Sequence, residues 1–203
     1  ELDRVKKNLD QPSLAEMTVK AIDVLSKNGN GYFLMVEGGR IDHALHGTNA
    51  KRVMEDTIAF DEAIKAALAK VDLNNTLLVF TADHDHTMAI NGYSKRGNPI
   101  LDISRNYKDG KEARDADGNT YTTLVFGNGP NRKDTRTSIV SGNTDSSMAL
   151  HDDYLQETAV RLASETHGGG DVMLGASGAG ARSFKGSMDN TKVFTLLKSA
   201  FGF

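Results

Sequence analysis

The sequence predicts an α/β fold in which helices flank a mostly parallel sheet. Two apolar runs, Tyr32 to Val36 and Thr76 to Phe80, have the length and composition of strands buried on both faces. Between them, apolar residues recur at helical spacing over residues 50–71. A strand, a crossover helix and a second strand form a β-α-β unit, so we expect the carboxyl ends of both strands at one edge of the sheet.

Length and composition are those of one globular domain. The chain has 203 residues, of which 38% are hydrophobic and 25% charged, so it is long enough to bury a sizeable core. Its formal charge is −3 and no basic stripe with interleaved aromatic residues occurs, so we expect no site specific for nucleic acid. The chain contains no cysteine, so any zinc must be held by histidine and carboxylate side chains.

No membrane segment is predicted, because no apolar run approaches the ~20 residues that span a bilayer. No signal peptide is visible, although a mature chain would already have lost one. The chain begins with Glu1 instead of methionine, which indicates a processed or cut chain.

The remaining elements follow in order along the chain. The first nine residues are polar and are expected to form a connection or a fraying end. Ser13 and Glu16 have the spacing of a capping box, which predicts a helix that ends at Asn28-Gly29. After the second strand, residues 91–119 are rich in Gly, Lys, Arg, Asn and Asp and are expected to be an excursion over the surface. Further strands are predicted at 122–126, 160–164 and 172–176, followed by a helix capped near Asp189.

Candidate ligands of a metal follow the ends of the predicted strands. Glu37 directly follows the first strand, and Asp42 and His46 have the i, i+4 spacing that places two side chains on one face of a helix. The second strand runs into Asp83 and His84. Carboxylate and imidazole side chains in this arrangement are suited to zinc.

The histidines are concentrated in a way that strengthens this interpretation. Five of the six lie in three short segments beside an acidic residue, and we interpret the sixth, His151, as a surface side chain. The candidates exceed the three protein ligands of one catalytic zinc, which indicates two metal ions. Two neighbouring metals are typical of in-line displacement at phosphorus, so hydrolysis of a phosphate ester is the leading hypothesis. The candidate ligands are Glu37, Asp42, His46, Asp83, His84 and His167.

Three motifs together resemble the alkaline phosphatase family. They are Val-Glu-Gly-Gly-Arg-Ile-Asp-His-Ala-Leu-His, Thr-Ala-Asp-His-Asp-His and Glu-Thr-His-Gly-Gly-Gly-Asp-Val, and they occur in the family's order. The resemblance extends from about Pro12 to the C-terminus. It implies that residues 1–203 are the C-terminal part of a single alkaline phosphatase-like α/β domain, with a sheet that is incomplete in this chain.

The resemblance also implies two zinc ions and one magnesium ion. By the family pattern, Asp42, His46 and His167 would hold the first zinc, and Asp83 and His84 would be two of the ligands of the second.

Three further residues receive roles only from the resemblance. Glu37 would be a ligand of the magnesium ion. His86 would lie behind the ligands and hydrogen-bond a carboxylate that binds zinc. His43 would contact bound phosphate through water.

Two segments of the family pattern do not occur in this sequence. The family carries its serine nucleophile in an Asp-Ser-Ala segment and a bridging aspartate in a Gly-Asp-Gly-Met segment, and both belong to its N-terminal half. The Asp145-Ser146 pair lies in a polar loop, in the wrong order relative to the other motifs, and we interpret it as surface. The chain therefore resembles the C-terminal half of the enzyme, whether as a fragment or as one chain of a nicked protein.

The resemblance implies partners and a location as well. We expect a phosphate monoester substrate, inorganic phosphate, an N-terminal half of the same enzyme, a second copy in a homodimer, and a periplasmic or secreted location. Other interpretations remain open: a related phosphodiesterase, sulfatase or cofactor-independent phosphoglycerate mutase, or a non-catalytic module for zinc binding or dimerisation. The Glu-Gly-Gly-Arg and Glu-Thr-His-Gly-Gly motifs favour the monoesterase.

Overall fold

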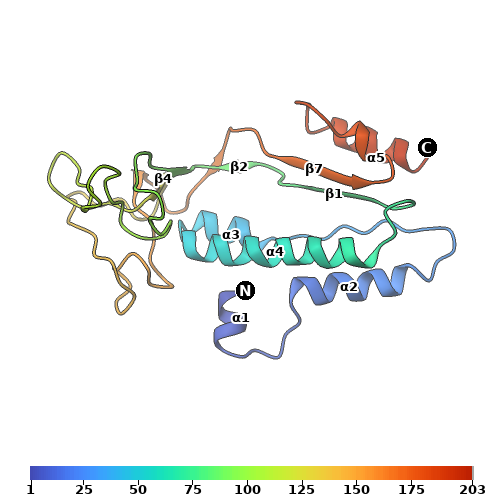
Figure 1. Cartoon of the computed structure of the whole chain (residues 1–203), viewed down its shortest axis with the longest axis horizontal. Coiled ribbons are helices and arrows are strands. Elements are labelled where there is room, and N and C mark those ends of the chain that lie inside the picture. Colours follow the sequence, from blue (N-terminus) through green and yellow to red (C-terminus); the bar gives the residue numbers. More distant parts are fainter. Residues whose placement is uncertain (203) are drawn as a thin grey trace.

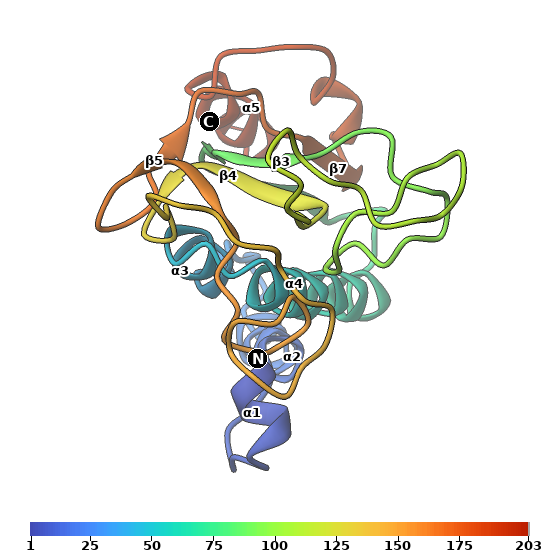
Figure 2. The same ribbon diagram turned by 90° about the vertical axis from the view of Figure 1, so that its left-hand side faces the viewer.

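The computed structural model describes residues 1–202, so residue 203, the last of the expected domain, lies outside the described residues. Helices and strands form layers in an α/β arrangement (Figure 1). Helices α2 (Leu14–Leu25) and α4 (Ala50–Lys70) pack against each other below the strands. Helix α5 (Lys192–Ala200) lies on the opposite side of the strands, as the perpendicular view also shows (Figure 2).

The predicted helices are confirmed, together with the capping box of α2. Ser13 Oγ accepts a hydrogen bond from Glu16 N at 3.2 Å, and the Glu16 carboxylate accepts one from Ser13 N at 2.7 Å. The 21-residue α4 begins after Asn49, whose side chain accepts from the backbone of Arg52.

The expectation of a fraying N-terminal end is wrong. Residues Leu2–Lys6 form helix α1, and Leu2 is buried. Asp3 accepts a hydrogen bond at 3.0 Å from Arg52 of α4, and the N-terminal ammonium contacts the Asp56 carboxylate at 2.9 Å. Charged side chains hold α1 against α4 through ion pairs. Sequence analysis assigns such side chains to solvent, so the polar composition did not indicate a helix.

The first two strand pairs are antiparallel. Strand β1 (Leu77–Thr81), predicted at 76–80, pairs with β7 (Leu174–Gly178), predicted at 172–176. Strand β2 (Asp85–His86) pairs with β6 (His167–Gly168), with His86 directly opposite His167. These two short strands are the ones that bring distant histidines together.

A third sheet has three strands and contains the one parallel pair among residues 1–202. Strand β4 (Leu124–Gly129) pairs antiparallel with β3 (Met88–Ile90) and parallel with β5 (Thr158–Arg161). The strands predicted at 122–126 and 160–164 are therefore present with shifted bounds. Within the described residues the strand pairs are small and mixed, so the α/β class holds without a large parallel sheet.

Residues 32–36 form no strand, so the predicted β-α-β unit is wrong for this chain. The segment alternates between exposed and half-buried positions, and Phe33 and Met35 are 61% and 75% exposed. A strand requires a neighbour that pairs with its backbone, and no strand of residues 1–202 pairs with this segment. Strand β1, the expected parallel neighbour, pairs with β7 instead.

Two apolar clusters hold the chain together. The first fixes helix α3 (Arg40–His46) between α4 and β4, and it consists of Ala44, Leu45, Val53 and Phe126. The second joins the two long connections on either side of β4, one from β3 and one to β5. It consists of Ile103, Ile139, Ala149 and Tyr154. Residues 91–119 form no helix or named strand, only turns and isolated bridges such as Ser94 to Asn106. None of the helices in the described part of the chain combines the length and the apolar character needed to cross a membrane.

Candidate metal centre

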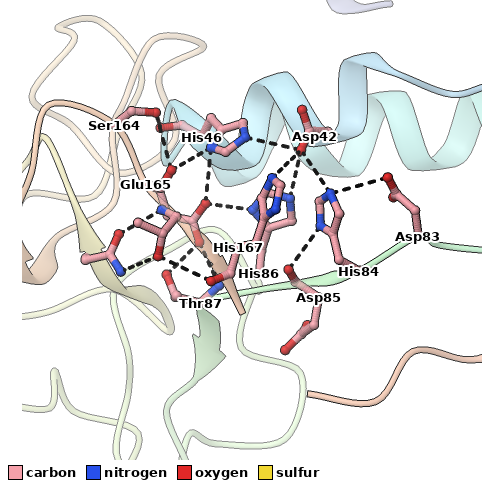
Figure 3. Close-up of polar contacts among 12 residues, drawn as sticks. Asp42, His46, Asp83, His84, Asp85, His86, Thr87, Ser164, Glu165 and His167 are labelled. Carbon is pink, nitrogen blue, oxygen red and sulfur yellow. Dashed lines mark hydrogen bonds and ion pairs between the residues drawn. The ribbon is translucent and has the colours of Figure 1, made fainter. Parts of the chain in front are cut away.

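Helix α3 presents an acidic and an imidazole side chain on one face. Ala44 and Leu45 are buried against the core, so they fix how the helix is turned. Asp42 and His46 lie one turn apart, and His46 Nε2 is 3.3 Å from Asp42 Oδ1. The short helix therefore delivers two candidate ligands from a rigid base (Figure 3).

Strands β2 and β6 deliver three more imidazoles to the same place. His86 and His167 are opposite each other in the antiparallel pair, and His84 lies just before β2. The rings of His84 and His167 are stacked, with centroids 3.5 Å apart and planes at 17°. Backbone pairing thus brings together residues that are about eighty positions apart in the sequence.

Four imidazole nitrogens converge on one carboxylate oxygen. Oδ1 of Asp42 lies 3.1 Å from Nε2 of His86 and 3.3 Å from Nε2 of His46. The Nε2 atoms of His167 and His84 lie 3.7 Å and 3.9 Å from the same oxygen. Figure 3 shows these rings pointing toward Asp42 from α3, β2 and β6.

The second ring nitrogen of three of these histidines faces an acceptor. His86 Nδ1 is 2.6 Å from Glu165 Oε2, His46 Nδ1 is 2.5 Å from the Glu165 carbonyl, and His84 Nδ1 is 3.2 Å from the Asp85 carbonyl. We assign the ring hydrogen to Nδ1 because carbonyl and carboxylate oxygens accept. In the neutral rings of His46 and His84, Nε2 then carries a lone pair that faces the Asp42 carboxylate, which is the arrangement that a cation stabilises.

Glu165 is a site residue that sequence analysis missed. It is 2% exposed, and its Oε1 accepts hydrogen bonds from the backbone N and the hydroxyl of Thr87, both at 2.7 Å. Its place two residues before His167 in the Glu-Thr-His-Gly-Gly-Gly-Asp-Val motif was an available signal. Sequence alone, however, gives no indication that this glutamate is buried.

The donor atoms form two groups that share His86. One consists of Asp42, His84, His86 and His167, and the other of His46, His86 and Glu165. In each group the atoms lie within 4.8 Å of one another.

Three of the predicted residues lie at or beyond the edge of these groups. Asp83 is 88% exposed, and its Oδ2 is 3.4 Å from His84 Nε2. Glu37 is exposed and folds back over Gly39, outside both groups. His43 is also exposed, and its Nδ1 is 3.2 Å from Arg40 Nη1. The structure therefore brings Asp42, His46, His84 and His167 together and leaves Asp83 at their edge. It does not bring Glu37 or His43 to them.

Glycine is required where the loop after His167 passes strand β2. A Cβ atom on Gly168 would lie 2.6 Å from the carbonyl oxygen of His86, which is backbone and cannot turn away. A Cβ atom on Gly170 would lie 2.5 Å from Oδ2 of Asp85. Close packing against this loop holds the segment that carries His84 and His86 in place.

The fold and the site together define an α/β protein with a candidate metal centre of histidine and carboxylate side chains. The family model described as alkaline phosphatase matches residues 1–203. The chain belongs to the alkaline phosphatase family, as the resemblance of its motifs indicated.

Individual relatives carry the same description. The chain is 39% identical over 176 residues to the tissue-nonspecific alkaline phosphatase isozyme of Rattus norvegicus. The matched region covers 85% of this chain and 32% of the relative. It is 40% identical over 181 residues to the corresponding isozyme of Gallus gallus, with 88% and 32% covered. It is 40% identical over 185 residues to a membrane-bound alkaline phosphatase of Bombyx mori, with 90% and 32% covered. The chain thus spans about a third of the length of these relatives.

Proposed function

We propose that this chain supplies most of the metal-binding side chains of a metal-dependent phosphomonoester hydrolase. The observation that carries the proposal is the convergence of four imidazole Nε2 atoms on Oδ1 of Asp42. Membership of the alkaline phosphatase family supports the same reaction class.

We assign two zinc ions and one magnesium ion to the centre. Asp42, His46 and His167 would hold the first zinc, and His84 with Asp83 would hold part of the second. The donor set fits zinc, which binds imidazole nitrogen and carboxylate oxygen. The acceptors at Nδ1 of His46 and His84 support this, since they leave Nε2 available to a metal. When bound, such ions polarise phosphoryl oxygens and lower the pKa of a coordinated oxygen nucleophile.

The remaining assigned residues prepare the surroundings of the centre. His86 would orient the Asp42 carboxylate, which it approaches at 3.1 Å. His43 would contact phosphate through water, and its exposed ring supports contact with solvent. Glu37 would hold magnesium; it lies apart from the histidine cluster, which is compatible with a separate ion.

The serine nucleophile, the bridging aspartate and the remaining strands would come from an N-terminal half of the enzyme. Neither an Asp-Ser-Ala nor a Gly-Asp-Gly-Met segment occurs in this sequence, and the chain spans about a third of its relatives. Added strands would pair with the backbone of residues 32–36 and complete the mostly parallel sheet. Phosphate monoesters would be the substrates, with a homodimer and a periplasmic or secreted location as in the family expectation.

A non-catalytic zinc-binding or dimerisation module is the second candidate. The exposed large apolar side chains of Met173 and Phe194 favour it over other enzyme classes. It predicts stoichiometric zinc with no turnover of any ester, even after an N-terminal half is added.

A discontinuous assay on a simple aryl phosphate tests the proposal. We expect no enzymatic rate from the purified chain alone, and alkaline-range activity after mixing with an N-terminal half that carries the two missing segments. His46→Ala should abolish the restored rate. Glu157→Gln, which removes a carboxylate that pairs with Arg136, should keep it. Turnover by the single chain that is lost in His46→Ala and indifferent to the added half would contradict the assignment of the nucleophile.

A further inference from the structure

We propose that Glu165 is a positioning residue whose carboxylate accepts a hydrogen bond from Nδ1 of His86 and thereby holds the ring with Nε2 toward Asp42. The inference deepens the proposed metal centre and rests on it for its consequence, while the hydrogen-bond geometry stands by itself. Glu165 Oε2 lies 2.6 Å from His86 Nδ1, and His86 Nε2 lies 3.1 Å from Asp42 Oδ1.

The Glu165 carboxylate is buried behind the rings of His46 and His86. The side chain has no exposed surface. Oε1 receives two hydrogen bonds from Thr87, one from the backbone N and one from the hydroxyl. Oε2 faces the Nδ1 atoms of His86 at 2.6 Å and His46 at 3.7 Å, on the side of the rings opposite Asp42. We therefore place Glu165 behind the ligands and not among them.

A buried carboxylate without hydrogen-bond donors is strongly unfavourable, so the donors around Glu165 indicate its role. Three donors from two neighbouring residues satisfy Glu165, and one of them is the imidazole of His86. The backbone of Glu165 adds two bonds to α3: its N donates to the His46 carbonyl at 2.9 Å, and its carbonyl lies 2.5 Å from His46 Nδ1. Glu165 thus orients His46 through its main chain and His86 through its side chain.

This division makes Glu165→Gln an informative substitution. Glutamine has the same shape, but one terminal atom accepts and the other only donates. The backbone N–H of Thr87 can only donate, so the amide oxygen must occupy the Oε1 position. The amide NH2 then faces Nδ1 of His86, which must become an acceptor and carry no hydrogen. The variant would thus lose the hydrogen bond from Nδ1 to a carboxylate that holds the ring of His86, while His46 would keep its carbonyl partner.

The first measurement is nitrogen NMR of the histidine rings in the metal-free 203-residue chain. We expect a hydrogen on Nδ1 of His86 in the wild type, an unprotonated Nδ1 in Glu165→Gln, and no change at His46. A purely structural glutamate would leave the ring nitrogens unchanged in this isosteric variant. An unprotonated Nδ1 of His86 in the wild type would overturn the proposal without need of any variant.

The second measurement is the affinity for zinc alone, by competition with a chelator. We expect Glu165→Gln to bind zinc ~10–100-fold more weakly than the wild type, the range typical of residues that orient metal ligands. Glu157→Gln, which removes a carboxylate that binds Arg136, is the matched control and should not change the affinity. Unchanged affinity in Glu165→Gln would overturn the proposed consequence. A wild-type chain that binds no zinc would instead reject the metal centre, and the ring NMR would still decide the role of Glu165.

Discussion

Oδ1 of Asp42 and Nε2 of His86 are 3.1 Å apart, although 44 positions separate the two residues in the chain. The contact joins α3 to β2. The Nε2 atoms of the other three clustered histidines lie 3.3 to 3.9 Å from the same oxygen. Asp42 is therefore the acidic centre of the cluster, whereas His86 contributes one of four rings. Removing these two side chains should have unequal effects.

We expect Asp42→Ala to reduce zinc affinity more than His86→Ala does. Loss of His86 should weaken binding by ~10–100-fold, as for other residues that orient metal ligands. Loss of Asp42 removes the anionic oxygen on which all four rings converge. Zinc titration checks the order, and circular dichroism checks that both variants remain folded. Zinc binding that vanishes in His86→Ala and persists in Asp42→Ala would reverse our assignment of ligand and orienting residue.

Gly168→Ala should destabilise the chain and weaken zinc binding together. The new Cβ would lie 2.6 Å from the His86 carbonyl, so β2 and β6 would have to separate. Crowding of this kind costs about 2 kcal/mol in well-packed sites. Gly169→Ala is the matched control, because no atom lies within 4 Å of the corresponding position. Urea unfolding of both variants measures the cost, and equal stability of the two would show that the loop shifts freely.

Asp152 should contribute stability that disappears in acid. Hydrogen bonds from Lys51 and Lys6, opposed in part by burial, lower the pKa of Asp152 to about 2. Because the folded pKa lies below the unfolded value, the contribution is present above pH ~4 and is lost as the pH falls toward 2. After allowance for solvent screening, we expect about 1 kcal/mol.

The comparison of wild type with Asp152→Asn tests this pH dependence. The difference in unfolding free energy should be present at neutral pH and close to zero near pH 2. Asp134→Asn, at an exposed position, should show little difference at either pH. A difference between wild type and Asp152→Asn that stays constant over this range would argue against the ion pairs with Lys6 and Lys51.

Local signals in the sequence predicted local structure well. Ser13 and Glu16 predicted the start of α2, and the i, i+4 spacing predicted that Asp42 and His46 share a face of α3, because both patterns act within one or two helical turns. The chain reversal that pairs His86 with His167 depends on residues about eighty positions apart and was not predictable from periodicity. Burial of Glu165 depends on Thr87 and His86 in the same way.

The apolar run at residues 32–36 shows where composition fails. Its residues predicted a strand buried on both faces, yet no strand among residues 1–202 pairs with it. Composition describes the surroundings that a segment favours, whereas a strand also needs a partner for its backbone. Under the proposed function, that partner belongs to an N-terminal half.

We therefore expect hydrogen exchange at residues 32–36 to depend on that half. In the isolated chain these amides should exchange rapidly. No strand in the described part of the chain pairs with the segment, so almost no free energy is needed to expose its N–H groups to solvent. In the reconstituted pair they should become protected, because strands of the added half would pair with their backbone. Amides of β1, which already pairs with β7, provide the internal control and should be protected in both samples. Protection at 32–36 that is strong in the isolated chain, or absent from an active reconstituted pair, would mean that this segment is not a strand of the completed sheet.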